Sequence, residues 1–194
     1  MKKVVRTAAM IAFMFVTATS MANEVKLSLE TEKESKSLVF ELDSQSTETT
    51  IKLFDSADHV IYFENISNLS YVKKFNLKNL DEGLYYFTTE NPLKKVTYII
   101  SVKDAEVKIL NRKENPKPIF RKKNEMVYLN LLNLEKKKVE IKVYDSSDRL
   151  VFSERRVNEM IIEKAFNFSK AYKDTYTLAV RDGNDSYYEY VIVK

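Results

Sequence analysis

The feature that most constrains this chain is a twelve-residue segment that occurs twice. Residues 51–62 read IKLFDSADHVIY and residues 141–152 read IKVYDSSDRLVF, 90 positions later and without a gap. Apolar residues alternate with polar ones on both sides of an Asp-Ser-x-Asp core, and a period of two predicts strands with one buried face. Asp and Ser favour tight turns because their side chains hydrogen-bond nearby backbone. Each copy is therefore predicted to be a β-hairpin within a duplicated unit.

The start of the chain has the pattern of an export signal. Three basic residues within positions 1–6 precede an apolar run over residues 8–16, and residues 20–22 read Ser-Met-Ala. A basic start, a short apolar run and small residues before the cut are typical of a secretory signal peptide. We therefore predict a signal peptide over residues 1–22. No transmembrane segment is expected after cleavage, because the apolar run is shorter than the roughly 20 residues that span a bilayer.

Composition excludes several classes of protein. The chain has no cysteine, so neither a disulfide nor a lipid-modified cysteine is available and stability must come from apolar burial. Only 2 glycines and 3 prolines occur, which disfavours flexible linkers. The net charge of +4 falls to +1 once the three basic residues of the leader are removed, so no nucleic-acid partner is expected.

Short alternating segments continue through the chain. In the first repeat they cover residues 24–29, 38–42, 49–54, 59–63, 71–77, 84–89 and 96–102. Such spacing, without a helical period outside the leader, is typical of antiparallel β-sandwiches. The predicted fold class is therefore all-β, with two tandem antiparallel β-sandwich (immunoglobulin-like) domains of about seven strands each. We place the first over residues 23–104 and the second over residues 105–194.

The second repeat is predicted by matching it to the first. Residues 106–109 resemble residues 24–27, so they are expected to open the second sandwich. Residues 112–123 are polar and basic and are expected to form the longest loop. Residues 188–194 match residues 97–103 at an offset of 91, so the last strand is expected to run to the end of the chain.

Two tyrosines occupy matching positions, Tyr85 and Tyr176, again 91 residues apart. A tyrosine in a strand of a sandwich is usually a packing residue whose hydroxyl finds a polar partner. We predict that both are structural, with a buried ring and a hydroxyl bound to backbone, as in the tyrosine corner of immunoglobulin-like domains.

Catalytic and metal-binding patterns are missing from the sequence. His59 is the only histidine, and Arg149 takes its place in the second copy, so it is interpreted as an exposed hairpin residue. Zinc sites and Ser–His or Cys–His nucleophiles need partners that the sequence does not supply. Aspartates within residues 55–58, 145–148 and 182–185 could offer oxygen ligands to calcium, but none matches the EF-hand loop and turn chemistry explains all three. Neither an enzymatic activity nor a cofactor or metal is predicted.

Basic residues cluster in two places, residues 112–123 and residues 136–138. One interpretation is contact with anionic glycans or lipid headgroups. The other is a solvated loop, since nearby acidic residues balance the overall charge.

Several motifs of each repeat resemble the C-terminal sorting domain of type IX secretion cargo (Por secretion tail-like) in Bacteroidota. The matching residues are 51–62, 75–77, Leu80, Gly83, Tyr85 and 100–103 in the first copy and 141–152, 166–168, Tyr176 and 191–194 in the second. The resemblance implies a β-sandwich whose last strand is recognised by the export machinery, with Val191, Val193 and Lys194 as candidate recognition residues. The second copy departs from the family pattern in having Asp174 where the family has glycine, two residues before its tyrosine.

The sequence therefore predicts an exported, non-enzymatic protein located in the periplasm, on the cell surface or outside the cell. The first hypothesis is a binding or adhesion module that meets a protein or a glycan at the envelope through its strand edges or loops. The alternative is a sorting-type domain pair whose partner is the type IX secretion machinery.

Overall fold

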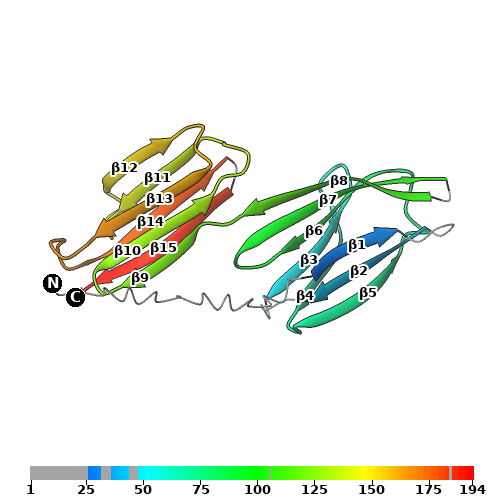
Figure 1. The fold of residues 1–194 in the computed structure, drawn as a ribbon, viewed down its shortest axis with the longest axis horizontal. Helices are drawn as coiled ribbons and strands as arrows, with labels where there is room; N and C mark the ends of the chain where they lie inside the picture. The colour runs from blue at the N-terminus through cyan, green and yellow to red at the C-terminus, as the bar shows by residue number, and fades with distance from the viewer. Residues whose placement is uncertain (1–25, 32–35, 44–47, 105, 184) are drawn as a thin grey trace, which may run out of the picture.

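The computed structural model describes residues 26–31, 36–104, 106–183 and 185–194, apart from residues 44–47. The predicted signal peptide at residues 1–22 lies outside the described residues. The described residues contain strands and turns and no helix. Their fifteen strands form four antiparallel sheets, which pack in pairs as two sandwiches that follow each other along the long axis of the molecule (Figure 1).

The first sandwich packs a three-stranded sheet of order β1-β2-β5 on a five-stranded sheet of order β4-β3-β6-β7-β8. Its strands are β1 (Lys26–Thr31), β2 (Ser37–Asp43), β3 (Thr49–Phe54), β4 (Val60–Ile66), β5 (Ser70–Asn76), β6 (Gly83–Glu90), β7 (Lys94–Lys103) and β8 (Glu106–Pro116). The alternating side chains of both sheets meet in one core, in which Phe40 and Phe87 are fully buried with ring centroids 5.2 Å apart.

The second sandwich packs a three-stranded sheet of order β13-β10-β9 on a four-stranded sheet of order β12-β11-β14-β15. Its strands are β9 (Ile119–Lys123), β10 (Met126–Leu132), β11 (Val139–Tyr144), β12 (Leu150–Arg156), β13 (Ile161–Asn167), β14 (Asp174–Asp182) and β15 (Asp185–Val193). A separate core fills it, with Ile141, Leu178 and Val180 fully buried. The predicted fold class, two tandem all-β antiparallel sandwiches, is confirmed.

The repeated hairpins have the same shape. In each, the register shifts at the last strand residue before the turn, and Asp58 and Asp148 adopt positive φ angles of 62° and 57°. The Oδ1 atom of Asp55 accepts the backbone N–H of Ala57 and His59 at 2.8 and 2.9 Å. Asp145 accepts the equivalent two N–H groups. The turn aspartate thus replaces ladder bonds that the reversing chain cannot make.

The predicted start of the second sandwich at residue 105 is wrong. β8 hydrogen-bonds along β7, and Val107 is buried in the core of the first sandwich. The strand that corresponds to β1 in the second sandwich is β9, which pairs with β10 as β1 pairs with β2. The likeness between residues 106–109 and 24–27 reflects a shared strand pattern, and the pattern alone does not specify the neighbour.

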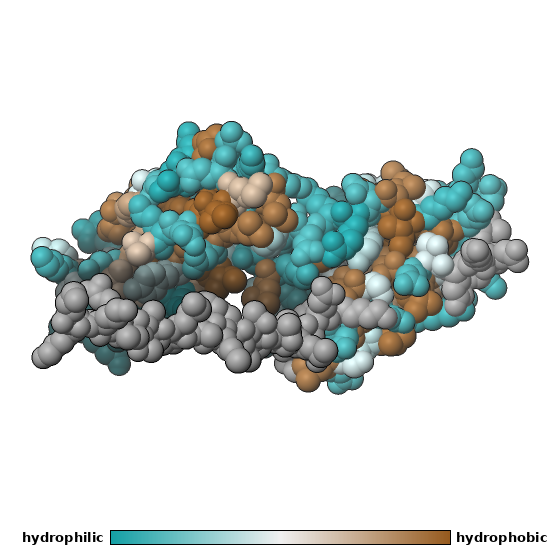
Figure 2. All heavy atoms as spheres, viewed as in Figure 1, coloured by the Kyte–Doolittle hydropathy of each residue, from teal (hydrophilic) through white to brown (hydrophobic). Residues whose placement is uncertain are grey.

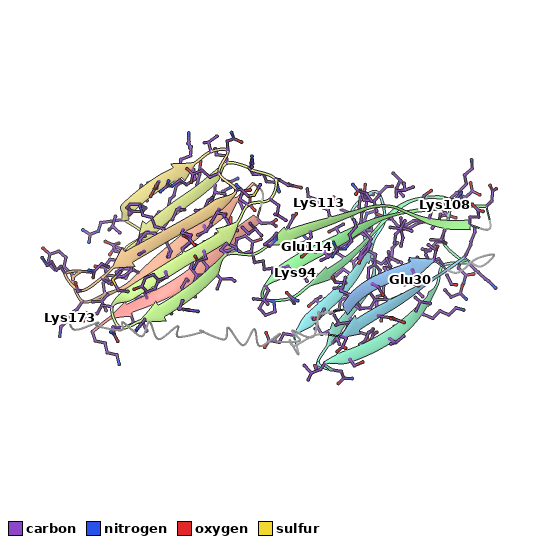
Figure 3. The ribbon with its side chains drawn as sticks, in the orientation of Figure 1. Glu30, Lys94, Lys108, Lys113, Glu114 and Lys173 are labelled. Atoms are coloured by element: carbon purple, nitrogen blue, oxygen red, sulfur yellow. The ribbon has the colours of Figure 1, made fainter. Side chains whose placement is uncertain are left out.

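The long loop expected over residues 112–123 is also corrected. β8 continues to Pro116 and β9 begins at Ile119, so the connection is short. The charged side chains that suggested a loop lie along strands instead. Glu114 accepts from Lys94 of β7 at 2.7 Å, which fastens β8 to β7 (Figure 3). It also accepts from Arg112 of its own strand at 2.6 Å.

Apolar side chains on the face seen in Figure 2 gather in separate areas of the two sandwiches, with polar residues between them. Among the described residues, no helix has the length and apolar character needed to cross a membrane.

Candidate functional site

Tyr85 and Tyr176 have structural positions. Both rings are buried, and Tyr176 packs on Phe168 with ring centroids 5.3 Å apart. The Tyr85 hydroxyl donates to the carbonyl of Asp81 at 2.8 Å, and that of Tyr176 donates to the carbonyl of Tyr172 at 3.1 Å. Each tyrosine thus ties the start of a strand to the preceding loop, the tyrosine-corner arrangement that the sequence predicted.

The three candidate recognition residues at the end of the chain lie in different environments. Val191 is buried in the second core, Val193 packs half-buried against it, and Lys194 is exposed. A partner therefore cannot touch Val191 without opening the sandwich. The large side chains that β15 presents to solvent at the alternate positions are Tyr188, Tyr190 and Ile192.

His59 is exposed at the first hairpin turn, and its Nδ1 atom lies 3.0 Å from Oδ2 of Asp55. Arg149 binds Asp145 in the same way in the second sandwich, at 2.7 Å. The carboxylates of both turns are thus engaged by their own hairpins. Within the part of the chain that the structure describes, no three His, Cys, Asp or Glu side chains converge as metal ligands would.

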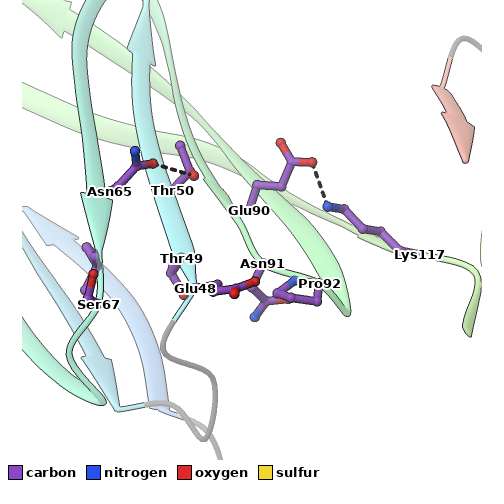
Figure 4. A pocket seen from close by; sticks show the side chains of 10 residues that line it. Glu48, Thr49, Thr50, Asn65, Ser67, Glu90, Asn91, Pro92 and Lys117 are labelled. Carbon is purple, nitrogen blue, oxygen red and sulfur yellow. Dashed lines mark hydrogen bonds and ion pairs between the residues drawn. The ribbon is translucent and has the colours of Figure 1, made fainter.

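A hollow of about 400 Å³ lies at the end of the first sandwich that adjoins the second (Figure 4). Two pairs of its polar groups bind each other: Lys117 binds Glu90 at 2.7 Å, and Thr50 donates to Asn65 at 2.9 Å. A hollow whose ion pair is closed offers a ligand little net charge. It is therefore a weaker candidate than the outer face of the four-stranded sheet in the second sandwich.

The outer face of the four-stranded sheet in the second sandwich carries an excess of cations. Alternate residues of a strand point to the same side, and the register places Arg155, Glu140 and Arg181 in one row across three strands. Lys142 and Lys138 flank Glu140 on its own strand segment. We call this surface the cationic face, formed by Lys138, Glu140, Lys142, Tyr144, Arg155, Ala179, Arg181 and Tyr188.

Glu140 is the one carboxylate among the residues that define the cationic face, and several cations share it. Lys138 binds it at 2.9 Å, Arg155 at 3.3 Å and Lys142 at 3.8 Å. The hydrogen bond from Lys138 and the nearby positive charges hold the pKa of Glu140 below its usual range. Because one carboxylate faces four cations, Arg181 included, the surface keeps a positive excess at neutral pH.

The cationic face is hollowed between its cations and its tyrosines. A depression of about 210 Å³ lies over Ala179, whose small side chain leaves room between Lys142, Arg181 and Tyr188. Tyr188 lies opposite Ala179 in the ladder and is mostly exposed. The depression thus offers a ligand an aromatic side and a cationic side.

At the equivalent positions the first sandwich keeps one of these cations, Lys52 for Lys142, and lacks both arginines. Thr50 corresponds to Glu140, Asn65 to Arg155 and Glu90 to Arg181, by the same pairings in the two sheets. Its outer face instead exposes Phe63 and Ile61, with Lys52 over the Phe63 ring. Arg155 and Arg181 are therefore a property of the second repeat and not of the shared scaffold.

From the sequence, Lys138 was identified only as part of a basic turn, and the cationic face was not predicted. The alternation of Lys138, Glu140 and Lys142 could have been noticed, since period two puts them on one side of a strand. The approach of Arg155 and Arg181 depends on two strand registers, which the local sequence does not contain.

No family model matches the chain, and a search of curated proteins found no match. Among solved structures, the chain is similar to the BSP domain of a biofilm associated protein, with 13% identity over 86% of this chain and 29% of that one and a TM-score of 0.29. It is similar to the human OSCAR ligand-binding domain, with 10% identity over 86% and 97% of the two chains and a TM-score of 0.26. A two-domain fibronectin type III segment of chicken tenascin gives 7% identity over 86% and 98% and a TM-score of 0.29. These low scores carry no conclusion about function.

Proposed function

We propose that the protein is an exported, non-enzymatic binding module that holds an anionic glycan at the cell envelope on its cationic face. The observation that carries the proposal is the replacement of Asn65 and Glu90 in the first repeat by Arg155 and Arg181 in the second. Export is supported by the signal-peptide pattern at residues 1–22.

The chemistry of the face suits an extended acidic polymer. Its cations are spread along neighbouring strands, so several acidic groups along one polymer could be bound at once. A tyrosine such as Tyr188 presents both an apolar ring and a polar hydroxyl to a ligand. Long-range attraction of a negative polymer also raises the rate of encounter at low salt.

Binding to polygalacturonate, with neutral dextran as the control polymer, tests the proposal by calorimetry. We expect the Arg155→Ala/Arg181→Ala double variant to lose about tenfold or more in affinity for polygalacturonate, which corresponds to about 1.4 kcal/mol. Binding should also weaken as salt rises from about 0.05 to 0.5 M, because the charges are exposed and are screened.

The matched control is Lys52→Ala in the first sandwich, at the position that corresponds to Lys142. It should leave polygalacturonate binding unchanged. Equal binding of both polymers, or an equal loss in the double variant and the control, would reject the cationic face as the binding surface.

A sorting-type domain pair remains the second candidate. It is favoured by the position of β15 at the edge of its sheet. Ile192, within the residues 191–194 that resemble the end of a sorting domain, is 70% exposed there. Removing the strand is a poor test, because Val191 and Val193 would leave the core. Cell fractionation of Ile192→Asp and Lys194→Ala variants is preferable. Folded variants held in the periplasm would support sorting, and unchanged export would argue against it.

A further inference from the structure

The two sandwiches differ at one edge of their larger sheets. In the first sandwich the outer edge of β7 is covered by β8, which pairs with it from Lys103 to Lys94. The corresponding strand of the second sandwich is β15, since β14 pairs with β15 in the register that β6 uses with β7. Among the described residues, no strand pairs with the outer edge of β15.

Exposure of the side chains follows this difference. Thr97, Ile99 and Ser101 of β7 are partly buried. Their counterparts on β15, Tyr188, Tyr190 and Ile192, are 58, 61 and 70% exposed.

The core side of the same strand is also less covered. Val102, which is opposite Val107 of β8 in the ladder, is only 1% exposed. Its counterpart Val193 has no strand beside it among the described residues and is only half-buried. A covering strand at β8's position would therefore bury apolar surface on both sides of the sheet.

The backbone of β15 has hydrogen-bonding groups that face outward. Lys122, from β9, donates its Nζ to the carbonyl of Tyr190 at 2.6 Å and also pairs with Glu189. The carbonyl of Tyr190 therefore points away from β14, and the N–H of the same residue points the same way in an antiparallel ladder. By alternation, the N–H and C=O groups of Tyr188 and Ile192 point outward as well.

Charged side chains are common on two other edge strands but scarce on the solvent-facing side of β15. The outer strands β8 and β9 carry clustered basic side chains, which discourage edge-to-edge pairing. On β15 the solvent-facing alternate positions after Ser186 are aromatic or aliphatic. Such an edge is a template for another strand.

We infer that two copies of this chain pair through their β15 strands, antiparallel and centred on Tyr190. In this register Tyr190 lies opposite Tyr190 of the second copy and Tyr188 lies opposite Ile192. Glu189 lies opposite Val191, so no like charges meet on the core side. The outward-facing backbone groups match in the same register, and a self-complementary strand of this kind selects a two-fold pair.

Lys122 limits the strength of this pairing. In the pair, the Tyr190 carbonyl accepts the N–H of Tyr190 from the second copy. The Lys122 ammonium must then give up its hydrogen bond to that oxygen, while its ion pair with Glu189 remains. Association is therefore weak and depends on concentration. It does not rest on glycan binding, because the pairing is made by the outward backbone groups of β15, and Tyr188 is the one residue named for both surfaces.

Disulfide cross-linking tests the register cleanly because the chain has no cysteine. Residues directly opposite in an antiparallel pair have Cα atoms about 4.5 to 5.5 Å apart, within the range that a disulfide spans. Tyr190→Cys should give a covalent dimer under mild oxidation. The control is Ile99→Cys, at the equivalent position of β7, where β8 already pairs with the strand. This variant should stay monomeric.

Sedimentation velocity over about a hundredfold range of concentration measures the unmodified equilibrium. We expect the wild type to pass from monomer to dimer, and Lys122→Ala to lower the dissociation constant about threefold to tenfold by removing one competing hydrogen bond. A protein that stays monomeric throughout would overturn the inference and leave the edge to a strand of another protein. Dimers in which Tyr190→Cys cross-links no better than Ile99→Cys would overturn it too.

Discussion

In each sandwich, one lysine of the three-stranded sheet binds a glutamate of the facing sheet and lies near an aromatic ring. Lys73 binds Glu64 at 2.9 Å and lies 4.8 Å from the centroid of the Tyr62 ring. In the second sandwich Lys164 pairs with Glu154 and lies 4.8 Å from the Phe152 ring. Hydrogen bonds from Tyr62, Tyr71 and Lys73 lower the pKa of Glu64 to about 2. A lysine held over an aromatic ring and bound to a carboxylate bridges the two sheets at that side.

Asp182, at the end of β14, has a pKa shifted in the opposite direction to that of Glu64. It is buried, its Oδ1 atom has no hydrogen-bond partner, and burial raises its pKa above the usual range. Its ionised form is therefore less favourable in the folded state than in the unfolded one. We expect Asp182→Asn to raise the melting temperature at neutral pH, and this gain should disappear as pH falls below the ordinary carboxyl range.

The control is Asp174→Asn at the other end of the same strand. Hydrogen bonds from Ser146 and from the Thr175 N–H lower the pKa of Asp174, so its stabilising effect is present above the unfolded pKa and is lost as pH falls. This variant should therefore melt lower at neutral pH. A melting series in which both substitutions change stability in the same direction would contradict the argument.

At the scale of elements, β8 matters most because it belongs to the first sandwich and leads into the second. Its pairing with β7 buries Val107, and the register shift at Leu110 leaves that side chain exposed. A unit cut at the predicted boundary would therefore lose part of its own core.

We expect a fragment of residues 23–117 to fold and a fragment of residues 23–104 to be less stable by at least about 2 kcal/mol. The estimate is the free energy of burying one valine side chain, without the lost ladder bonds. Urea unfolding of the two fragments measures the difference. The shorter fragment should also self-associate, since β7 becomes an open edge. Equal stability of the two would show that β8 is dispensable.

At the scale of the whole molecule, two separate cores are joined by a short connection. Pro116 ends β8, Pro118 is buried, and β9 starts at Ile119. Lys113 of β8 binds Glu135 of the second sandwich at 2.7 Å. Exposed ion pairs contribute little to stability, so the restricted backbone of the prolines should set the relative orientation.

Replacing both prolines with glycine should widen the distribution of distances between the sandwiches. Spin labels on one introduced cysteine in each sandwich measure it by pulsed electron resonance, since no native thiol interferes. Pro92→Gly, in the turn between β6 and β7, is the control and should leave the distribution narrow. An unchanged distribution in the double variant would show that side-chain contacts, and not the prolines, fix the joint.

The sequence alone determined the class of fold and most strands. Alternation with a period of two is a local property, so the hairpins at residues 51–62 and 141–152 and the roles of Tyr85 and Tyr176 are predictable from the residues around them. The short turns made by Asp55 and Asp145 followed from their own side-chain chemistry.

Tertiary structure decided which strands are neighbours. Residues 106–109 have a pattern that fits the edge of either sandwich, and only the pairing with β7 places them in the first. The same holds for the cationic face, where Arg155 and Arg181 reach Glu140 through two registers, and for the uncovered edge of β15. Strand pairing joins residues far apart in the chain, so local pattern cannot specify it, whereas local pattern does specify that a strand forms.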